Sequence, residues 1–139
     1  MMGTHILWAA FVAWFIAQIL KVLIPLLQVK KFNIRRFIES GGMPSSHTAM
    51  VIALTTSIAK YEGFQSTGFA IALVFSSIVM YDASGVRRAA GKQAVILNEI
   101  IRDIYHHKYK GHLLKELIGH TPLEVLAGFI LGLVVGILV

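Results

Sequence analysis

The feature that most constrains this chain is a set of long apolar segments separated by polar ones. The first runs over residues 6–29 and has only four interruptions, at Gln18, Lys21, Pro25 and Gln28. A helix needs about 20 residues to cross the hydrocarbon core of a bilayer, so this segment is long enough to span it. Three more apolar segments predict further spanning helices, at about 45–61, 66–82 and 121–139.

The composition favours a membrane protein over a soluble domain. Hydrophobic residues make up 56% of the chain and charged residues only 14%, whereas soluble domains have about 25% charged residues. No cysteine is present, which excludes disulfides, thiolate zinc sites and cysteine nucleophiles. The first apolar segment is too long for a signal peptide and lacks a basic region before it, so we expect no cleavable signal.

The segment 89–105 has a different pattern. Its apolar residues recur at helical spacing, at Ala90, Ala94, Leu97, Ile101 and Ile104. This pattern predicts an amphipathic helix that lies on the membrane or over the site. We expect the residues before it, 82–88, to form a polar loop. The predicted fold is therefore all-α, a single membrane-embedded domain with about four transmembrane helices and an amphipathic helix near the site.

The basic residues are distributed unevenly between the two sides of this bundle. Two long loops, 30–47 and 82–120, fall on one side, which together with Lys21 carries twelve of the thirteen Lys and Arg residues; Lys60 alone falls on the other. The positive-inside rule places these loops in the cytoplasm and both termini outside, although an anion-binding site biases the count in the same way. The net charge of +6 indicates anionic membrane lipids as partners, and we expect no nucleic-acid binding, because the basic residues occupy short loops between apolar segments.

Two histidines precede or begin predicted helices on this side. Ser45, Ser46 and His47 follow Pro44 at one helix N-terminus, and His120 precedes another. Helix N-termini bind anions through free N–H groups and the helix dipole. Glu124 lies four residues after His120, on the same helix face, and suits an acceptor for the imidazole N–H. Alone, Ser45, Ser46 and His47 are equally explained as a helix cap with a hydrated histidine, and His120 with Glu124 is better explained as a cap pair at the membrane interface. Together on one side, the two motifs favour function.

Further basic residues lie near these histidines. Arginine forks match phosphate oxygens, and Arg87 and Arg88 follow Ser84; they are also explained as positive-inside anchors. A second basic cluster contains Lys30, Lys31, Arg35 and Arg36, which suits an anchor to anionic lipid as well as a phosphate site. Three more histidines, His106, His107 and His112, lack carboxylate or thiolate neighbours, so we predict no metal site.

Small and polar residues within the apolar segments predict helix packing. Gly128, Gly132 and Gly136 recur every four residues, a pattern typical of closely packed helices in membranes. Two interpretations stay open, packing within the monomer and packing against a second copy in a homodimer. Gln18 and Lys21 either face the bundle interior, where polar groups are often functional, or reach the interface along the membrane surface.

The motifs together resemble the type-2 phosphatidic-acid phosphatase superfamily, which also contains the vanadium haloperoxidases. The resemblance covers about residues 30–136 and rests on Pro-Ser-Ser-His (44–47), the arginines after Ser84, and Gly-His-Thr-Pro-Leu-Glu-Val-Leu-Ala-Gly (119–128). It is strongest to that superfamily's small, divergent bacterial and plastid branch. The family pattern is a Lys…Arg-Pro element, Pro-Ser-Gly-His, and Ser-Arg followed after a short gap by His-x-x-x-Asp. The elements occur here in the same order.

The chain departs from this pattern at five points. Ser84 and Arg87 are not adjacent, whereas the family has Ser-Arg. Ser46 replaces a glycine, and Glu124 is one methylene longer than the family's aspartate. About thirty residues separate the arginines from His120, and no Arg-Pro follows Lys30 or Lys31.

The resemblance implies a role for each matching residue. It implies that His120 is a nucleophile that forms a phosphohistidine, that His47 is the general acid, and that Glu124 orients His120. The phosphate-binding residues it implies are Arg87, Arg88, Ser45, Ser46 and Ser84, with Lys30, Lys31, Arg35 and Arg36 as candidates for the first element. The implied enzyme is a lipid phosphate or diphosphate phosphatase of the bacterial inner membrane that needs no metal or cofactor. Haloperoxidase activity is not expected, because it requires bound vanadate.

Two other functions fit parts of the sequence. The serine at position 46 and the unmatched first element suit a non-catalytic scaffold protein that binds lipid phosphates. A small transporter fits less well, because four helices enclose little pore and the sequence has no inverted repeat.

Overall fold

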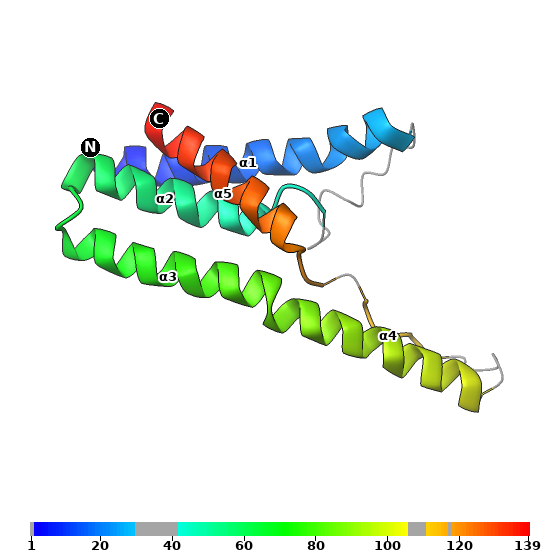
Figure 1. Cartoon of the computed structure of the whole chain (residues 1–139). Helices are drawn as coiled ribbons and strands as arrows, with labels where there is room; N and C mark the ends of the chain where they lie inside the picture. The colour runs from blue at the N-terminus through cyan, green and yellow to red at the C-terminus, as the bar shows by residue number, and fades with distance from the viewer. Residues whose placement is uncertain (1, 30–41, 106–110, 117) are drawn as a thin grey trace.

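The computed structural model describes residues 2–29, 42–105, 111–116 and 118–139, and over these residues it contains five α-helices and no strand (Figure 1). The helices are α1 (Met2–Val29), α2 (Ser46–Glu62), α3 (Thr67–Ser84), α4 (Val86–Ile104) and α5 (Pro122–Leu138). The prediction of an all-α helical bundle is confirmed. Four of the five helices match the predicted spanning segments, and α1 begins four residues earlier than expected.

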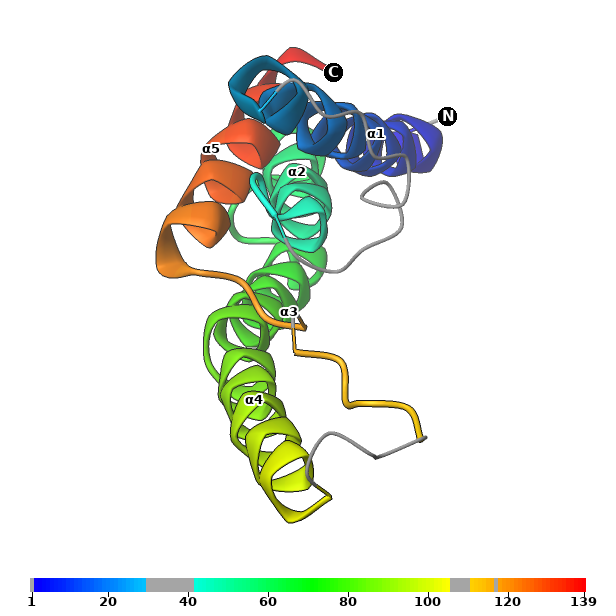
Figure 2. The same cartoon turned by 90° about the vertical axis from the view of Figure 1, so that its right-hand side faces the viewer.

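Helix α2 lies at the centre of the bundle and contacts α1, α3 and α5 (Figures 1 and 2). Its position explains its sequence. It buries Thr48, Thr55 and Ser57, and the hydroxyls of the two threonines have hydrogen-bond partners within the protein. Thr55 Oγ1, for example, lies 2.7 Å from Ser76 Oγ and donates to Val51 O at 2.8 Å. A helix surrounded by other helices needs no continuous apolar surface toward lipid.

Length and composition distinguish the helices as membrane spans. Among the described residues, two stretches are long and apolar enough to cross a bilayer, Gly3–Leu26 and Thr67–Ile104, and Pro122–Leu138 is a shorter apolar helix. Four complete spans therefore stay a prediction.

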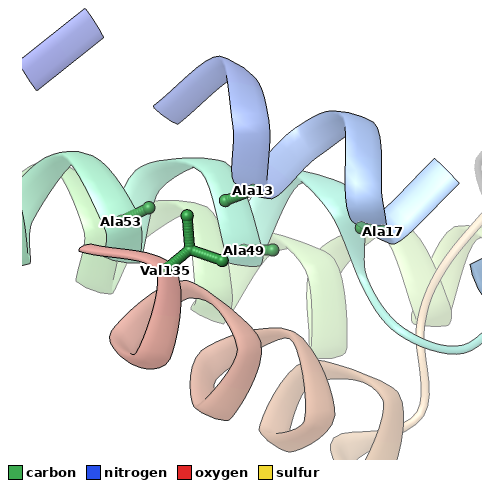
Figure 3. Close-up of a cluster of buried hydrophobic side chains, with 5 residues drawn as sticks. All are labelled: Ala13, Ala17, Ala49, Ala53 and Val135. Atoms are coloured by element: carbon green, nitrogen blue, oxygen red, sulfur yellow. The ribbon is translucent and has the colours of Figure 1, made fainter. Parts of the chain in front are cut away.

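Small side chains form the centre of the bundle. Ala13, Ala17, Ala49, Ala53 and Val135 make one buried cluster that joins α1, α2 and α5 (Figure 3). Small residues let helix backbones approach closely, which is the main source of packing energy where lipid surrounds the protein.

The glycine stripe of α5 packs against α2 of the same chain. A Cβ atom at Gly128 would lie 2.4 Å from Ser45 O, and one at Gly132 would lie 2.5 Å from Ala49 O. Gly136 is equally close to α2, since its Cβ would lie 2.6 Å from Thr56 Cβ. Of the two interpretations left open by the sequence, packing within the monomer is the one observed. A homodimer stays a prediction and would need a different surface.

The prediction of a polar loop at residues 82–88 is wrong. Helix α3 continues to Ser84, and α4 begins at Val86 with only Gly85 between them. Backbone hydrogen bonds pass through the junction, because Gly85 N–H donates to Tyr81 O at 2.8 Å and Ala89 N–H donates to Gly85 O at 2.9 Å. The polar side chains of residues 82–88 therefore lie on helices α3 and α4 and not in a loop.

The amphipathic helix is present, but it does not lie over the site. Helix α4 runs on from α3 and projects away from the bundle (Figures 1 and 2), and among the described helices it contacts α3 alone. Its apolar face is exposed at Ile96, Leu97, Ile100 and Ile104. Attachment of this face to the membrane surface stays a prediction.

Candidate functional site

Three helix ends meet at one end of the bundle, away from both chain termini (Figure 1). The start of α2 is joined to the start of α5, because Ser45 N–H donates to Glu124 O at 3.0 Å. The residue before α5 is joined to the end of α3, because His120 N–H donates to Ala83 O at 2.9 Å. The two histidine motifs, which are distant in sequence, therefore belong to one cluster.

His120 is held in a defined position. It is 3% exposed, and its Nδ1 lies 3.0 Å from Glu124 Oε2. The same carboxylate oxygen accepts from Thr121 N–H at 3.0 Å, and Thr121 Oγ1 accepts from Glu124 N–H at 3.3 Å. This is a complete capping box at the start of α5. Glu124 therefore both caps α5 and holds the ring of His120. The interpretation of this motif as a helix cap and its interpretation as a functional site are compatible.

The second ring nitrogen of His120 is different. Nε2 is buried and has no hydrogen-bond partner among the described residues. The Glu124 carboxylate can only accept, so we assign the hydrogen to Nδ1, which leaves a lone pair on Nε2. A buried polar atom without a partner is uncommon in native proteins and is a typical property of ligand sites.

The surroundings of His120 favour its neutral form. Burial lowers the pKa of its imidazole below the ordinary value, and this effect outweighs the hydrogen bond with Glu124, which raises it. Lys21 and Arg87 lower the pKa further by charge repulsion. A neutral imidazole with a free Nε2 has the form that a nucleophile requires.

The serines and histidine of α2 divide into buried and accessible residues. Ser45 is fully buried and caps α2, since its Oγ accepts from Thr48 N–H at 3.4 Å and from Thr48 Oγ1 at 3.0 Å. Ser46 is 1% exposed. His47 is exposed in the first turn of α2, and it interacts electrostatically with His120, Lys21 and Arg87. His47 can therefore exchange protons with water while lying near His120.

Lys21 is the functional candidate that the sequence-based site did not include. It comes from α1, is 3% exposed, and donates from Nζ to Ser46 Oγ at 3.0 Å. Lys21 interacts electrostatically with Glu124, His47 and His120. The signal was a lysine within a largely apolar helix. Of the two orientations left open, the inward one is observed.

The remaining predicted residues are placed unevenly. Arg87 is exposed, pairs through Nε with Asp82 Oδ2, and lies within electrostatic reach of both histidines. Arg88 is exposed. Ser84 donates its hydroxyl to Met80 O of its own helix at 2.9 Å. The basic cluster of Lys30, Lys31, Arg35 and Arg36 lies outside the described residues, as do His106 and His107.

A returning segment explains the long separation between the arginines and His120. The described residues 111–116 and 118–119, called the strap below, lead back along α4 to His120 (Figure 2). Asn98 of α4 is 1% exposed and makes three hydrogen bonds to the strap. Its Nδ2 donates to Leu114 O at 2.9 Å and to Glu116 Oε1 at 2.8 Å, and its Oδ1 accepts from Leu114 N–H at 2.9 Å.

The strap also touches α4 at two glycines. A Cβ atom at Gly91 would lie 2.5 Å from Glu116 O, and one at Gly119 would lie 2.4 Å from the backbone of Arg88. The chain runs away from the site along α4 and returns through the strap, so that Gly119 lies beside the backbone of Arg87 and Arg88. The roughly thirty inserted residues lengthen the path in sequence but not the separation in space.

The fold and the site together define a class: a membrane helical bundle in which His47 and His120 lie at two neighbouring helix N-termini. The chain matches the Divergent PAP2 family over residues 2–135 and belongs to that family. It is 40% identical to the uncharacterized membrane protein YuiD of Bacillus subtilis (strain 168), with 84% of this chain and 82% of that protein covered. No solved structure matches the chain. The predicted family is confirmed, and the chain is a membrane protein.

Proposed function

We propose that this protein is a membrane phosphatase that hydrolyses a lipid phosphate or diphosphate through a phosphohistidine on His120. The observation that carries the proposal is the buried, unpartnered Nε2 of His120, whose Nδ1 is held by Glu124. Membership of the Divergent PAP2 family supports a phosphatase-related protein.

In the first chemical step, the Nε2 lone pair of His120 attacks the phosphorus atom. The bond between phosphorus and the lipid oxygen breaks, and His47 gives that oxygen a proton. The imidazole then carries a positive charge, which the neighbouring Glu124 carboxylate stabilises. In the second step His47 removes a proton from water, the resulting oxygen attacks phosphorus, and the N–P bond breaks to regenerate neutral His120.

The charges around the histidines suit a phosphate. Lys21 is a buried cation whose described hydrogen-bond partner is the neutral Ser46 hydroxyl. The carboxylate that attracts it, Glu124, is already engaged by His120 and Thr121. A buried charge is costly without a counter-charge, and a phosphate group would supply one. Lys21 is therefore proposed as a phosphate-binding residue, and the roles suggested for Lys30, Lys31, Arg35 and Arg36 stay predictions.

Arg87 adds a second cation within electrostatic reach of both histidines. Its pairing with Asp82 is exposed, and exposed pairs contribute little free energy, typically about 0–1 kcal/mol. The guanidinium is therefore available to a phosphate at small cost. The positive dipole ends of α2 and α5 add to the attraction for a phosphate.

The uneven distribution of Lys and Arg supports a cytoplasmic location for the site in a bacterial inner membrane. Membrane lipids are the proposed surroundings and a lipid phosphate the proposed substrate. The alternative function is a non-catalytic lipid-phosphate scaffold. The observation that favours it is the hydrogen bond from Lys21 to Ser46. Ser46 stands where the family has glycine, and its hydroxyl occupies the ammonium group of Lys21.

Purified protein in detergent, assayed for phosphate release, tests this proposal. The panel contains phosphatidic acid, phosphatidylglycerophosphate, isoprenyl phosphates and diphosphates, and soluble phosphomonoesters, each with wild type and His120→Ala. The phosphatase predicts release from a lipid substrate that is lost in His120→Ala. If nothing is hydrolysed while orthovanadate still binds, the scaffold function replaces it.

A further inference from the structure

Among the described residues, the side-chain hydrogen bonds between the strap and α4 all involve one buried amide, that of Asn98. Most of the α4 surface is exposed, but Asn98 is 1% exposed and is bound to Leu114 and Glu116 by three hydrogen bonds. Both amide atoms are therefore used on the strap. An amide that is buried and fully directed at one segment fixes where that segment lies, because any displacement leaves buried polar atoms without partners.

The fit between strap and helix is tight on both sides of this amide. Gly91, two turns before Asn98, lies so close to Glu116 O that a Cβ atom would be 2.5 Å from it. Gly119 lies equally close to the backbone of Arg88. The strap therefore has little freedom to move toward or along α4.

The strap ends at His120. His120 N–H donates to Ala83 O at 2.9 Å, which makes its backbone the link between the strap and the end of α3. His120 directly follows Gly119, the last residue of the strap, so displacement of the strap would also move or expose the imidazole.

We propose that Asn98 is a positioning residue that keeps His120 in place and shielded from water by tying the strap to α4. The catalytic part of this inference rests on the proposed function, but the positioning part does not. Nothing in the sequence motifs points to Asn98, because it acts through the strap and not on the substrate.

Release of the strap has a defined electrostatic consequence. The charged and titratable groups that interact with His120 come from four helices: Lys21 from α1, His47 from α2, Arg87 from α4 and Glu124 from α5, with Asp82 of α3 beside His47 and Arg87. Burial is the largest influence on the His120 pKa and lowers it. Entry of water therefore raises the pKa of His120 toward its ordinary value, while the neighbouring charges stay the same.

The test compares Asn98→Ala with Gln93→Ala, which removes an exposed amide from the same helix. Two measurements are made: turnover as a function of pH, and NMR titration of ¹³C-labelled histidine with His120→Gln to assign the signal. We expect kcat to fall about 10- to 100-fold in Asn98→Ala, because small misplacements of catalytic groups have effects of this size, with KM changed little. We also expect His120 to titrate at higher pH, so that the acid limb of the profile moves upward.

Two further variants keep the inference testable if Asn98→Ala does not fold. Glu116→Ala removes one of the three hydrogen bonds and should give a smaller shift in the same direction. Gly91→Ala keeps Asn98 but forces the strap outward. Unchanged kcat and unchanged His120 titration in the folded variants would overturn the inference. If wild type hydrolyses nothing, the proposed function fails, but the His120 titration still decides whether Asn98 positions it.

Discussion

The starts of α2 and α5 each combine a histidine with a hydroxyl N-cap residue, Ser45 or Thr121, but they differ in how their polar atoms are used. At the start of α2, the Ser45 hydroxyl caps the helix and the Ser46 hydroxyl accepts from Lys21. At the start of α5, Thr121 and Glu124 form the cap, and His120 keeps one buried nitrogen without a described partner. The first is a satisfied structural end, whereas the second leaves an atom for a ligand.

This difference shows how a helix cap and a reactive group coexist. In α5 the cap is made by residues after His120, so its formation does not use Nε2. In α2 the cap is made by Ser45, which belongs to the Pro-Ser-Ser-His motif. Its hydroxyl is therefore largely occupied by the hydrogen bonds from Thr48. Chemistry is therefore expected to depend on the α5 motif most strongly, and stability on the α2 serine.

The largest expected effect is that of His120→Ala. Removal of a nucleophile leaves only binding and electrostatic stabilisation, so we expect turnover to fall by about 10⁴-fold or more. Circular dichroism and thermal unfolding in detergent serve as controls for folding. If the variant keeps more than a tenth of wild-type turnover, His120 is not the nucleophile. The start of α5 would then have no greater role in catalysis than the start of α2.

A smaller loss is expected for Lys21→Met, which keeps the length and apolar stem of the side chain. Loss of one charged group that holds a phosphoryl oxygen should reduce kcat/KM by about 100-fold or more. The matched control is Lys60→Met, because Lys60 is exposed and donates to Ile137 O at the other end of the bundle. Orthovanadate inhibition should weaken in Lys21→Met and not in Lys60→Met. Equal inhibition of both would place Lys21 outside the phosphate site.

The pH dependence of stability should show the buried imidazole directly. Because the folded-state pKa of His120 is lowered, the unfolded chain takes up a proton first as pH falls. The stability that this group contributes is present above its ordinary pKa of about 6.5 and is lost as the pH falls below it. We expect wild type to lose more thermal stability than His120→Gln between pH 7.5 and about pH 5. Parallel curves would show that His120 is not held in its neutral form.

The smallest effect is expected for Ser45→Ala. Removal of a serine cap lowers the free energy of unfolding by about 1 kcal/mol. Ser66→Ala is the matched control, since Ser66 caps α3 by accepting from Phe69 N–H at 3.1 Å. Similar stability losses in the two variants are expected. A much larger loss of turnover in Ser45→Ala than in Ser66→Ala would show that the Ser45 hydroxyl also binds phosphate.

The sequence predicted the helices and part of the site for clear physical reasons. Long apolar segments specify helices in a membrane, and their alternating directions place both histidines at the same end of the bundle. The contact of Ser45 with Glu124 brings the two helix starts together there. The role of Lys21 depended on the rotation of α1 about its axis, which apolar residues on every side of the helix do not fix. The inward orientation became clear only from its contact with Ser46.

Other features depended on contacts between distant parts of the chain. Polar residues around Gly85 suggested a loop, but backbone hydrogen bonds carry the helix through the junction. Asn98 looked like one of several polar residues on an amphipathic helix. Its role is defined by Leu114 and Glu116, which return to it from 16 and 18 residues further along the chain, and no local pattern indicates such a return.

The most direct test of the central claim is identification of the covalent intermediate. Wild type is mixed briefly with the lipid phosphate that it hydrolyses, quenched in alkali to preserve phosphohistidine, digested, and examined by mass spectrometry. The account predicts a phosphoryl group on Nε2 of His120 in wild type and none in His120→Ala. Phosphate release without label on His120, or label on a different residue, would contradict it.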